Sequence, residues 1–182
     1  MTLLDMAKAF DSVTHPYINK LLKRMSFPLL FINYILDQIE NNTAQFLNGK
    51  YIAAPNITIN RGTRQGLPIS PILFNLCIEP LVLEIHNKLS GIPVPPTYLL
   101  PHRAEHNTPE NTIKILAFAD DLITFNTSFT DILHTVKICE DFGQISGFSL
   151  NQTKTKIYCS EFCGAIIQSK PLYSAHTYVT VP

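Results

Sequence analysis

A run of β-branched, aliphatic and aromatic residues over positions 113–125 predicts β-structure, and two adjacent aspartates, Asp120 and Asp121, interrupt it. Aspartate is disfavoured within strands and favoured in turns, so we expect the chain to reverse between Ala119 and Leu122. The pattern therefore predicts a β-hairpin that carries both carboxylates at an exposed tip.

The same pattern predicts elements elsewhere along the chain. Helical spacing of apolar residues predicts a helix that begins at Pro16, a second helix over 29–39, and a third over 130–145 that Gly147 stops. The pair Asn48-Gly49 predicts a hairpin turn, and residues 155–159 are typical of a strand. Interleaved strands and helices indicate a single mixed domain.

Residues 60–71 are rich in glycine and arginine and lead into a further helix. Ser70 is the expected N-cap and Pro71 the expected first helical residue. Pro80 lies inside the apolar pattern that follows and should kink the helix or split it. Glycine amides and arginines next to a helix N-terminus favour phosphate binding, although such a sequence is often an ordinary loop.

Adjacent carboxylates among apolar neighbours are costly to keep ionised unless a cation compensates them. A further aspartate, Asp5, follows a short apolar run near the start of the chain. Together Asp5, Asp120 and Asp121 could form a set of hard oxygen ligands, which suits Mg²⁺ or Mn²⁺. Two such ions, about 3.5–4 Å apart, would serve phosphoryl transfer. An isolated aspartate is more often a turn or capping residue, and this alternative stays open for each of them.

Four segments, taken in order, resemble the palm of reverse transcriptases, most closely those of non-LTR, LINE-type retrotransposons. They are Asp5–Asp11, Arg64–Pro71, Phe118–Asp121 and Ser146–Thr155. The resemblance covers residues from about 3 to 158. It implies an α+β polymerase palm, in which an antiparallel sheet carries an acidic β-hairpin and packs against helices.

The resemblance also implies a role for individual residues. Asp5 and Asp120 would be the principal metal ligands and Asp121 a nearby third carboxylate, with two Mg²⁺ or Mn²⁺ ions as cofactors. Lys154 would assist departure of the pyrophosphate as a catalytic general acid. The expected nucleotide-binding residues are Phe10, Arg64, Gln65 and Gly66.

Phe10 and Lys154 also have simpler interpretations. As the family's sugar-facing aromatic, Phe10 would reject a ribose 2′-hydroxyl because a planar ring leaves no room for another oxygen. Without the family, Phe10 would be a core aromatic and Lys154 a solvated surface charge.

The expected organisation is a palm domain over 1–158, with a Pro-rich insertion at about 92–111 and an irregular tail over 159–182. The expected partners are an RNA template, a DNA primer and deoxynucleoside triphosphates. The segments that hold triphosphate and template in the family, its fingers, have no counterpart here, so we expect a truncated retroelement copy. A catalytically inactive palm remnant is the main alternative; a phosphoacceptor signalling domain and an intron maturase are the others.

Composition narrows these expectations. The chain has 182 residues and a formal net charge of +0, so it lacks the basic footprint of a free-standing nucleic-acid binder. Four cysteines without zinc-site spacing indicate reduced thiols in an intracellular protein. The longest apolar run is too short to span a membrane, so no membrane association is expected.

Overall fold

The structure is a computed structural model of the 182-residue chain. The residues that it describes are 1–40, 42–45, 47–48, 50–52, 56–63, 66–94, 112–151, 153–160 and 177–181.

A five-stranded sheet forms the centre of the molecule, in the order β11-β10-β1-β9-β8. Neighbouring strands are antiparallel except β10 and β11, which are parallel. The strand bounds are β1 Thr2–Asp5, β8 Ile115–Phe118, β9 Asp121–Thr124, β10 Lys156–Ser160 and β11 Thr177–Val181. The predicted acidic hairpin is confirmed as β8 and β9, and the predicted strand near residue 155 as β10.

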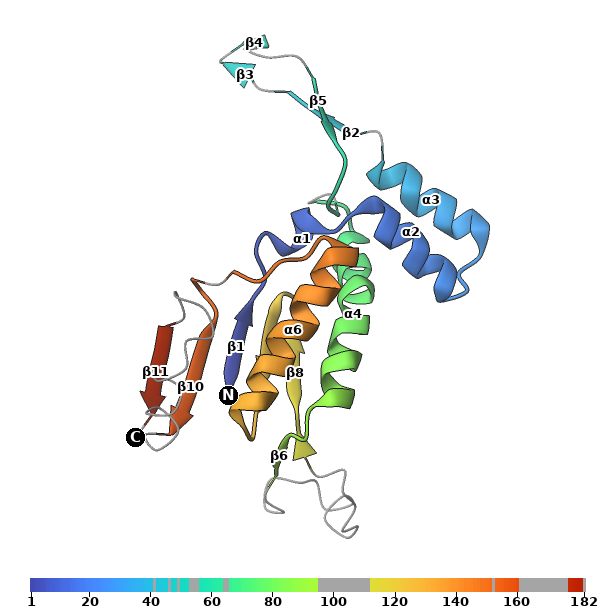
Figure 1. Cartoon of the computed structure of the whole chain (residues 1–182). Helices are drawn as coiled ribbons and strands as arrows, with labels where there is room; N and C mark the ends of the chain where they lie inside the picture. The colour runs from blue at the N-terminus through green and yellow to red at the C-terminus, as the bar shows by residue number, and fades with distance from the viewer. Residues whose placement is uncertain are drawn as a thin grey trace.

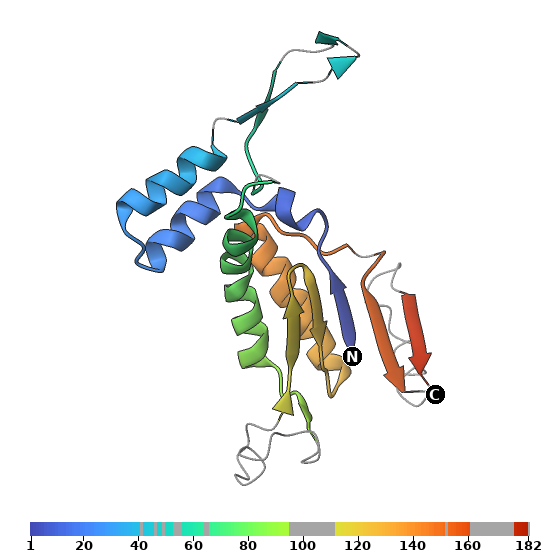
Figure 2. The ribbon, with the colours of Figure 1, turned by 180° about the vertical axis from the view of Figure 1, so that it is seen from behind.

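Two long helices, α4 and α6, lie side by side against one face of this sheet, and Figure 2 shows the opposite face without a helix over it. The helices are α1 Ala9–Ser12, α2 His15–Arg24, α3 Leu29–Ile39, α4 Ser70–Lys88 and α6 Phe129–Ser146. Alternation along each strand sends every second side chain towards the helices, and Leu4 and Leu122 are 0% exposed there. The predicted α+β class with an antiparallel, helix-backed sheet is therefore confirmed.

The local sequence explains where α6 begins and ends. The Ser128 hydroxyl accepts a hydrogen bond from the amide of Asp131 at 3.1 Å, and the Asp131 carboxylate accepts one from the amide of Thr127 at 3.0 Å. The first bond satisfies an amide that the first turn leaves free, and the second ties the residue before the N-cap to the helix. Gly147 ends the helix in the left-handed region at φ 89°, as predicted.

Helix α4 differs from its prediction in two details. It is continuous through Pro80, so of the predicted kink or split the split does not occur, and it begins at Ser70 with Ile69 as the N-cap, so the expected cap is wrong by one residue. A proline weakens the preceding turn because it lacks an amide and crowds a carbonyl. The Tyr17 hydroxyl donates to the carbonyl of Cys77, three residues before Pro80, at 2.8 Å and so supports this turn.

In the described part of the chain, three short two-stranded sheets accompany the main sheet. Two of them form an arm that extends away from the helices (Figure 1). In the arm, β2 (Asn42–Ala44) pairs with β5 (Ile57–Ile59), and β3 (Leu47–Asn48) pairs with β4 (Tyr51–Ile52). The hairpin predicted near Asn48 is confirmed, although Asn48 itself is a strand residue opposite Tyr51.

Short strands lie within the expected insertion and within the expected tail. Ile92–Pro93, at the start of the expected Pro-rich insertion, forms strand β6 and pairs with β7 (Thr112–Ile113). Residues 95–111 lie outside the described part of the chain. Residues 177–181, in the expected irregular tail, form β11 because their backbone groups pair with β10.

The core lies between the sheet and α4 and continues under α2 and α3. Its largest fully buried side chains are Phe74, Leu4, Ile18, Leu22, Ile32, Ile35, Ile39, Leu73, Leu81, Ile85, Leu122 and Ile157. Among the described helices, none has both the length and the apolar character needed to span a bilayer.

The loop that precedes α4 is fastened to α1 by backbone hydrogen bonds. The amide of Gly62 donates to the carbonyl of Val13 at 2.7 Å, and the amide of Thr63 donates to the carbonyl of Phe10 at 2.8 Å. Gly62 has a φ of +93°, and a Cβ there would lie 2.9 Å from Asp11 Cα. Only glycine fits this close approach without displacing backbone.

We predict that Gly62→Ala destabilises the fold by about 2–4 kcal/mol, because it adds left-handed strain and a backbone clash. The matched control is Gly66→Ala, since Gly66 has a similar φ of +92° but nothing within 4 Å of an added Cβ. The control should cost only about 1 kcal/mol. Urea denaturation measures both, and equal costs would contradict the close approach.

Candidate functional site

Strand register brings two of the predicted acidic residues together. Asp5 ends β1 and lies directly opposite Asp121, the first residue of β9. Residues opposite each other in an antiparallel pair point to the same face, with Cβ atoms about 4.5–5.5 Å apart. Their neighbours Leu4 and Leu122 are buried against the helices, so alternation along the strands makes Asp5 and Asp121 project from the opposite face of the sheet.

The third predicted carboxylate, Asp120, lies in the tight turn of the β8–β9 hairpin and is exposed. Phe118 pairs with Asp121, which leaves Ala119 and Asp120 as the two loop residues. Ala119, the first loop residue, has a φ of +52°, whereas Asp120, the second, does not have a positive φ. That combination matches a type II′ turn, in which the first loop position normally requires glycine.

These three carboxylates do not form one ready cluster in this structure. Among the described residues, no three His, Cys, Asp or Glu side chains lie together in a way that could hold a metal ion. Mg²⁺ is commonly held by one or two carboxylates together with substrate phosphates, and keeps several waters. The adjacent Asp5 and Asp121 fit that kind of binding, with Asp120 one residue away.

A lysine lies beside this acidic pair. Lys154 Nζ is 4.0 Å from Asp5 Oδ1, and the side chains are 70% and 30% exposed respectively. An ion pair this exposed adds little stability, about 0–1 kcal/mol. Lys154 is thus a solvated cation, as in its simpler interpretation, and it also lies next to Asp5.

A turn after α6 holds Lys154 in place through residues to which the sequence analysis assigned no role. The amide of Asn151 donates to the carbonyl of Asp5 at 2.8 Å, and the amide of Asp5 donates to the Thr155 hydroxyl at 3.4 Å. The Asn151 side chain accepts from the Thr153 hydroxyl at 2.8 Å and from the amide of Lys154 at 3.3 Å. An asparagine followed by polar residues is a known turn signal, but its partner Asp5 is visible only in the fold.

Phe10 fits both of its interpretations. Its ring stacks on buried Phe74 with a centroid distance of 4.2 Å and an interplanar angle of 19°, so it packs on the core. It is only half-buried, and it also lines two cavities.

Phe10 belongs to the lining of both cavities. The first, of about 410 Å³, is also lined by Gly66, Leu67, Pro68, Ser70 and Pro71. The second, of about 440 Å³, is also lined by Pro71, Asn75, Ile78, Glu79, Val82, Ala117, Phe118 and Ala119. Both volumes are in the range of small-molecule sites, and the second adjoins the hairpin tip. Phe10 and Gly66 are thus brought together, while Arg64 and Gln65 lie outside the described residues.

The sheet face that bears the acidic pair also carries exposed apolar side chains. Phe118, opposite Asp121, is 84% exposed, and Leu116 on the same face is 50% exposed. Exposed apolar side chains in a continuous row mark a surface that binds another molecule. The arrangement can hold a divalent ion at its acidic end, a small ligand next to Phe10, and a larger ligand along the strands.

The sequence profile of the family described as "Reverse transcriptase (RNA-dependent DNA polymerase)" matches residues 1–176 of this chain. Similar proteins include the "Retrovirus-related Pol polyprotein from type-1 retrotransposable element R2" of Popillia japonica, 31% identical over 152 residues, which are 84% of this chain and 20% of that protein. The R2DM Pol polyprotein of Drosophila melanogaster is 30% identical over 151 residues, 83% of this chain and 13% of its own length. The "Transposon TX1 uncharacterized 149 kDa protein" of Xenopus laevis is 27% identical over 152 residues, 84% of this chain and 11% of its own.

We predict that Ala119→Gly stabilises the protein by about 0.5–1 kcal/mol, because relief of the left-handed strain exceeds the entropy cost of glycine. Ala117→Gly, two residues earlier in β8, is the matched control and should destabilise by about 0.5–1 kcal/mol. Denaturant titrations of both variants check this. Equal destabilisation by the two would argue against a strained turn.

Proposed function

The chain belongs to the reverse transcriptase (RNA-dependent DNA polymerase) family, and from that premise we propose that its acidic site performs RNA-templated nucleotidyl transfer. The substrates would be a DNA primer, an RNA template and deoxynucleoside triphosphates. The observation that carries the proposal is the register of β1 and β9, which sets Asp5 opposite Asp121 beside Lys154 and the hairpin tip.

The cofactors of this proposal are two divalent ions, Mg²⁺ or Mn²⁺. Asp5, Asp120 and Asp121 would hold them through carboxylate oxygens, the donors that these ions prefer. When bound, the ions would neutralise charge on the phosphates and on the attacking and leaving oxygens. Because Asp5 and Asp121 are neighbours on one face, the substrate's own phosphates can complete the coordination without a third carboxylate in the same cluster.

Lys154 is the group that would act on the leaving pyrophosphate. The primer 3′-hydroxyl would lose its proton to solvent as its oxygen attacks the α-phosphorus, and the bond from phosphorus to the bridging oxygen would break. The departing pyrophosphate would take up a proton from Lys154, which solvent then restores. Support comes from the turn at Asn151, whose hydrogen bonds to the backbone of Asp5 keep the lysine next to the acidic pair.

The incoming nucleotide would bind next to Phe10. The stack on Phe74 fixes the Phe10 ring, and a fixed ring can exclude a ribose 2′-hydroxyl by size. Gly66 lines the same cavity, and the neighbouring Arg64 and Gln65 are proposed to contact the triphosphate and the templating base pair.

The primer end would lie along the sheet face that bears the acidic pair, in the manner of a polymerase palm. Exposed Phe118 and Leu116 offer apolar contacts to sugars and bases, and a base stacked on an aromatic ring gains about 1–3 kcal/mol.

The chain spans between 10% and 25% of the length of the curated relatives that it matches. The activity of those whole proteins is therefore a proposal for this chain.

We predict that Mn²⁺ stabilises the chain against heat. At a concentration tenfold above its dissociation constant, a bound ion adds about 1.4 kcal/mol, which is a shift of about 3–6 °C in Tm. Asp120→Asn should lose most of this shift, whereas the control Asp37→Asn, which removes an exposed carboxylate from α3, should keep it. Melts with and without the ion measure the effect, and an unchanged wild-type Tm would count against the metal site.

We also predict that the 182 residues alone extend a primer too slowly to detect. Alignment of reactants supplies about 7–11 kcal/mol of barrier reduction, and the chain's zero net charge gives it little hold on a duplex. The assay is primer extension on an RNA template with Mg²⁺ or Mn²⁺ and all four deoxynucleoside triphosphates.

Asp120→Asn serves as the control in this assay. Extension by the wild type that disappears in Asp120→Asn would contradict the predicted low activity while supporting the proposed chemistry. Equal extension by both purified proteins would contradict the role assigned to Asp120.

A further inference from the structure

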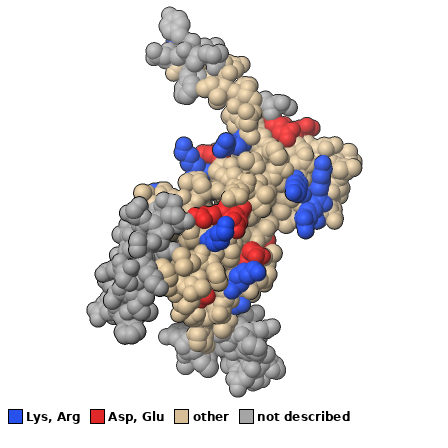
Figure 3. Space-filling view, viewed as in Figure 1, with Lys and Arg blue, Asp and Glu red and all other residues tan. Residues whose placement is uncertain are grey.

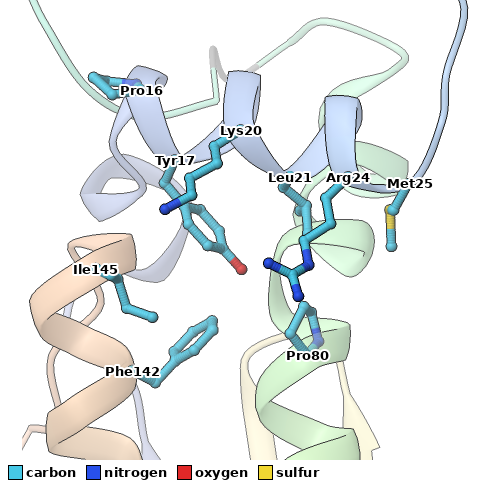
Figure 4. Close-up of a pocket in the computed structure, with 9 residues that line it drawn as sticks. All are labelled: Pro16, Tyr17, Lys20, Leu21, Arg24, Met25, Pro80, Phe142 and Ile145. Carbon is cyan, nitrogen blue, oxygen red and sulfur yellow. The ribbon is translucent and has the colours of Figure 1, made fainter.

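A groove of about 630 Å³ lies where α2 crosses α4 and α6, and Figure 4 shows the side chains that surround it. It is lined by Pro16, Tyr17, Lys20, Leu21, Arg24, Met25, Pro80, Phe142 and Ile145. It shares no residue with the cavities beside Phe10. Because its walls are helices, it is separate from the acidic pair on the other face of the sheet.

The floor of the groove is aromatic and fixed in position. Tyr17 and Phe142 meet edge to face with a centroid distance of 5.7 Å and an interplanar angle of 86°. The Tyr17 hydroxyl is already bonded to the carbonyl of Cys77, and burial raises the pKa of that hydroxyl, so it stays neutral. The floor thus offers ring surface to a ligand and no charge.

The rim combines exposed apolar side chains with cations. Ile145 is 64% and Met25 38% exposed, although both border an apolar floor. Lys20 and Arg24 extend from successive turns of α2 above the groove (Figure 4). No acidic residue lines the groove, and within the described part of the chain neither cation has an ion-pair partner. Figure 3 shows one group of basic side chains over α2, with further basic groups elsewhere on the same face.

This composition distinguishes between two classes of ligand. A nucleic acid strand held by its phosphates needs an extended row of cations, and the few basic residues here border a mainly apolar surface. An amphipathic protein segment instead needs an apolar groove with opposite charges along the rim. In the similar proteins the matched region is 10–25% of the chain, so most of each protein lies outside it and can supply such a segment.

We propose that this groove binds an acidic, amphipathic protein segment that inserts apolar side chains over Tyr17 and Phe142 and places carboxylates beside Lys20 and Arg24. The contact lies on the helical layer, so it would anchor a neighbouring part of a larger assembly without covering the acidic pair. This proposal does not depend on the proposed catalytic activity.

The test uses the full 182-residue chain with methyl-labelled methionine, observed by NMR. The chain has 3 methionines, of which Met25 lines the groove and Met6 is buried in the core as an internal reference. The probe is a capped peptide of about 15 residues, long enough to form a helix, with leucines on one face and glutamates on the flanks. We expect the Met25 signal to shift during titration and the Met6 signal to stay in place.

Charge-reversal variants measure how much Lys20 and Arg24 contribute to peptide binding. The double variant Lys20→Glu with Arg24→Glu should weaken peptide binding by about tenfold or more, since it turns two attractions into repulsions. Lys23→Glu, on the same helix but outside the groove lining, is the matched control and should bind as the wild type does. Ile145→Asp should also weaken binding, and its high exposure means that the fold should tolerate the change.

Several outcomes would overturn the proposal. These are equal binding by all variants, equal binding of a peptide with lysine in place of glutamate, and no shift of Met25 at millimolar peptide. If a single-stranded RNA oligonucleotide shifts Met25 and loses binding in the double variant while the peptide does not bind, the groove is a nucleic-acid surface instead.

Discussion

The antiparallel register between β1 and β9 is the constraint on which the candidate site depends. It places Asp5 opposite Asp121, and it places Leu4 opposite Leu122 on the other side of the same two strands. A slip of one residue in β1 would exchange the faces of its side chains, burying a carboxylate among the helices and exposing a leucine. The apolar packing that stabilises the sheet is therefore the same interaction that orients the acidic residues outwards.

Backbone hydrogen bonds then fix the surroundings of those carboxylates. The turn at Asn151 bonds to both sides of Asp5, which ties β1 to the segment that carries Lys154. At the other end of the site, Gly62 and Thr63 bond to the α1 region, so the loop before α4 and the Phe10 ring are held together. Each of these bonds joins segments far apart in sequence, and none of them requires a particular side chain except glycine at Gly62 and the threonine hydroxyl at Thr155.

The fold gives its two faces different chemistry. The sheet face bears carboxylates beside exposed aromatic and aliphatic residues, which suits a metal-bound phosphate and a nucleic acid strand. The helical face bears cations beside an aromatic groove, which suits an acidic protein segment. The chain's zero net charge is thus a sum of unlike local surfaces, and it does not describe either of them.

The sequence by itself determined the local elements and the identity of the chemical groups. Alternation and turn residues predicted the β8–β9 hairpin, helical spacing and capping predicted α2, α3 and α6, and four short motifs indicated the family, because these signals depend on near neighbours in the chain. Only the tertiary structure decided that α4 continues through Pro80, which a tyrosine from α2 supports, and that residues 177–181 become a strand, because β10 offers an edge to pair with. It also decided that Asp5 faces Asp121 across the two strands, and that Asn151 and Thr155 hold the site together. Register and long-range hydrogen bonds arise from packing between distant segments, and no local pattern specifies them.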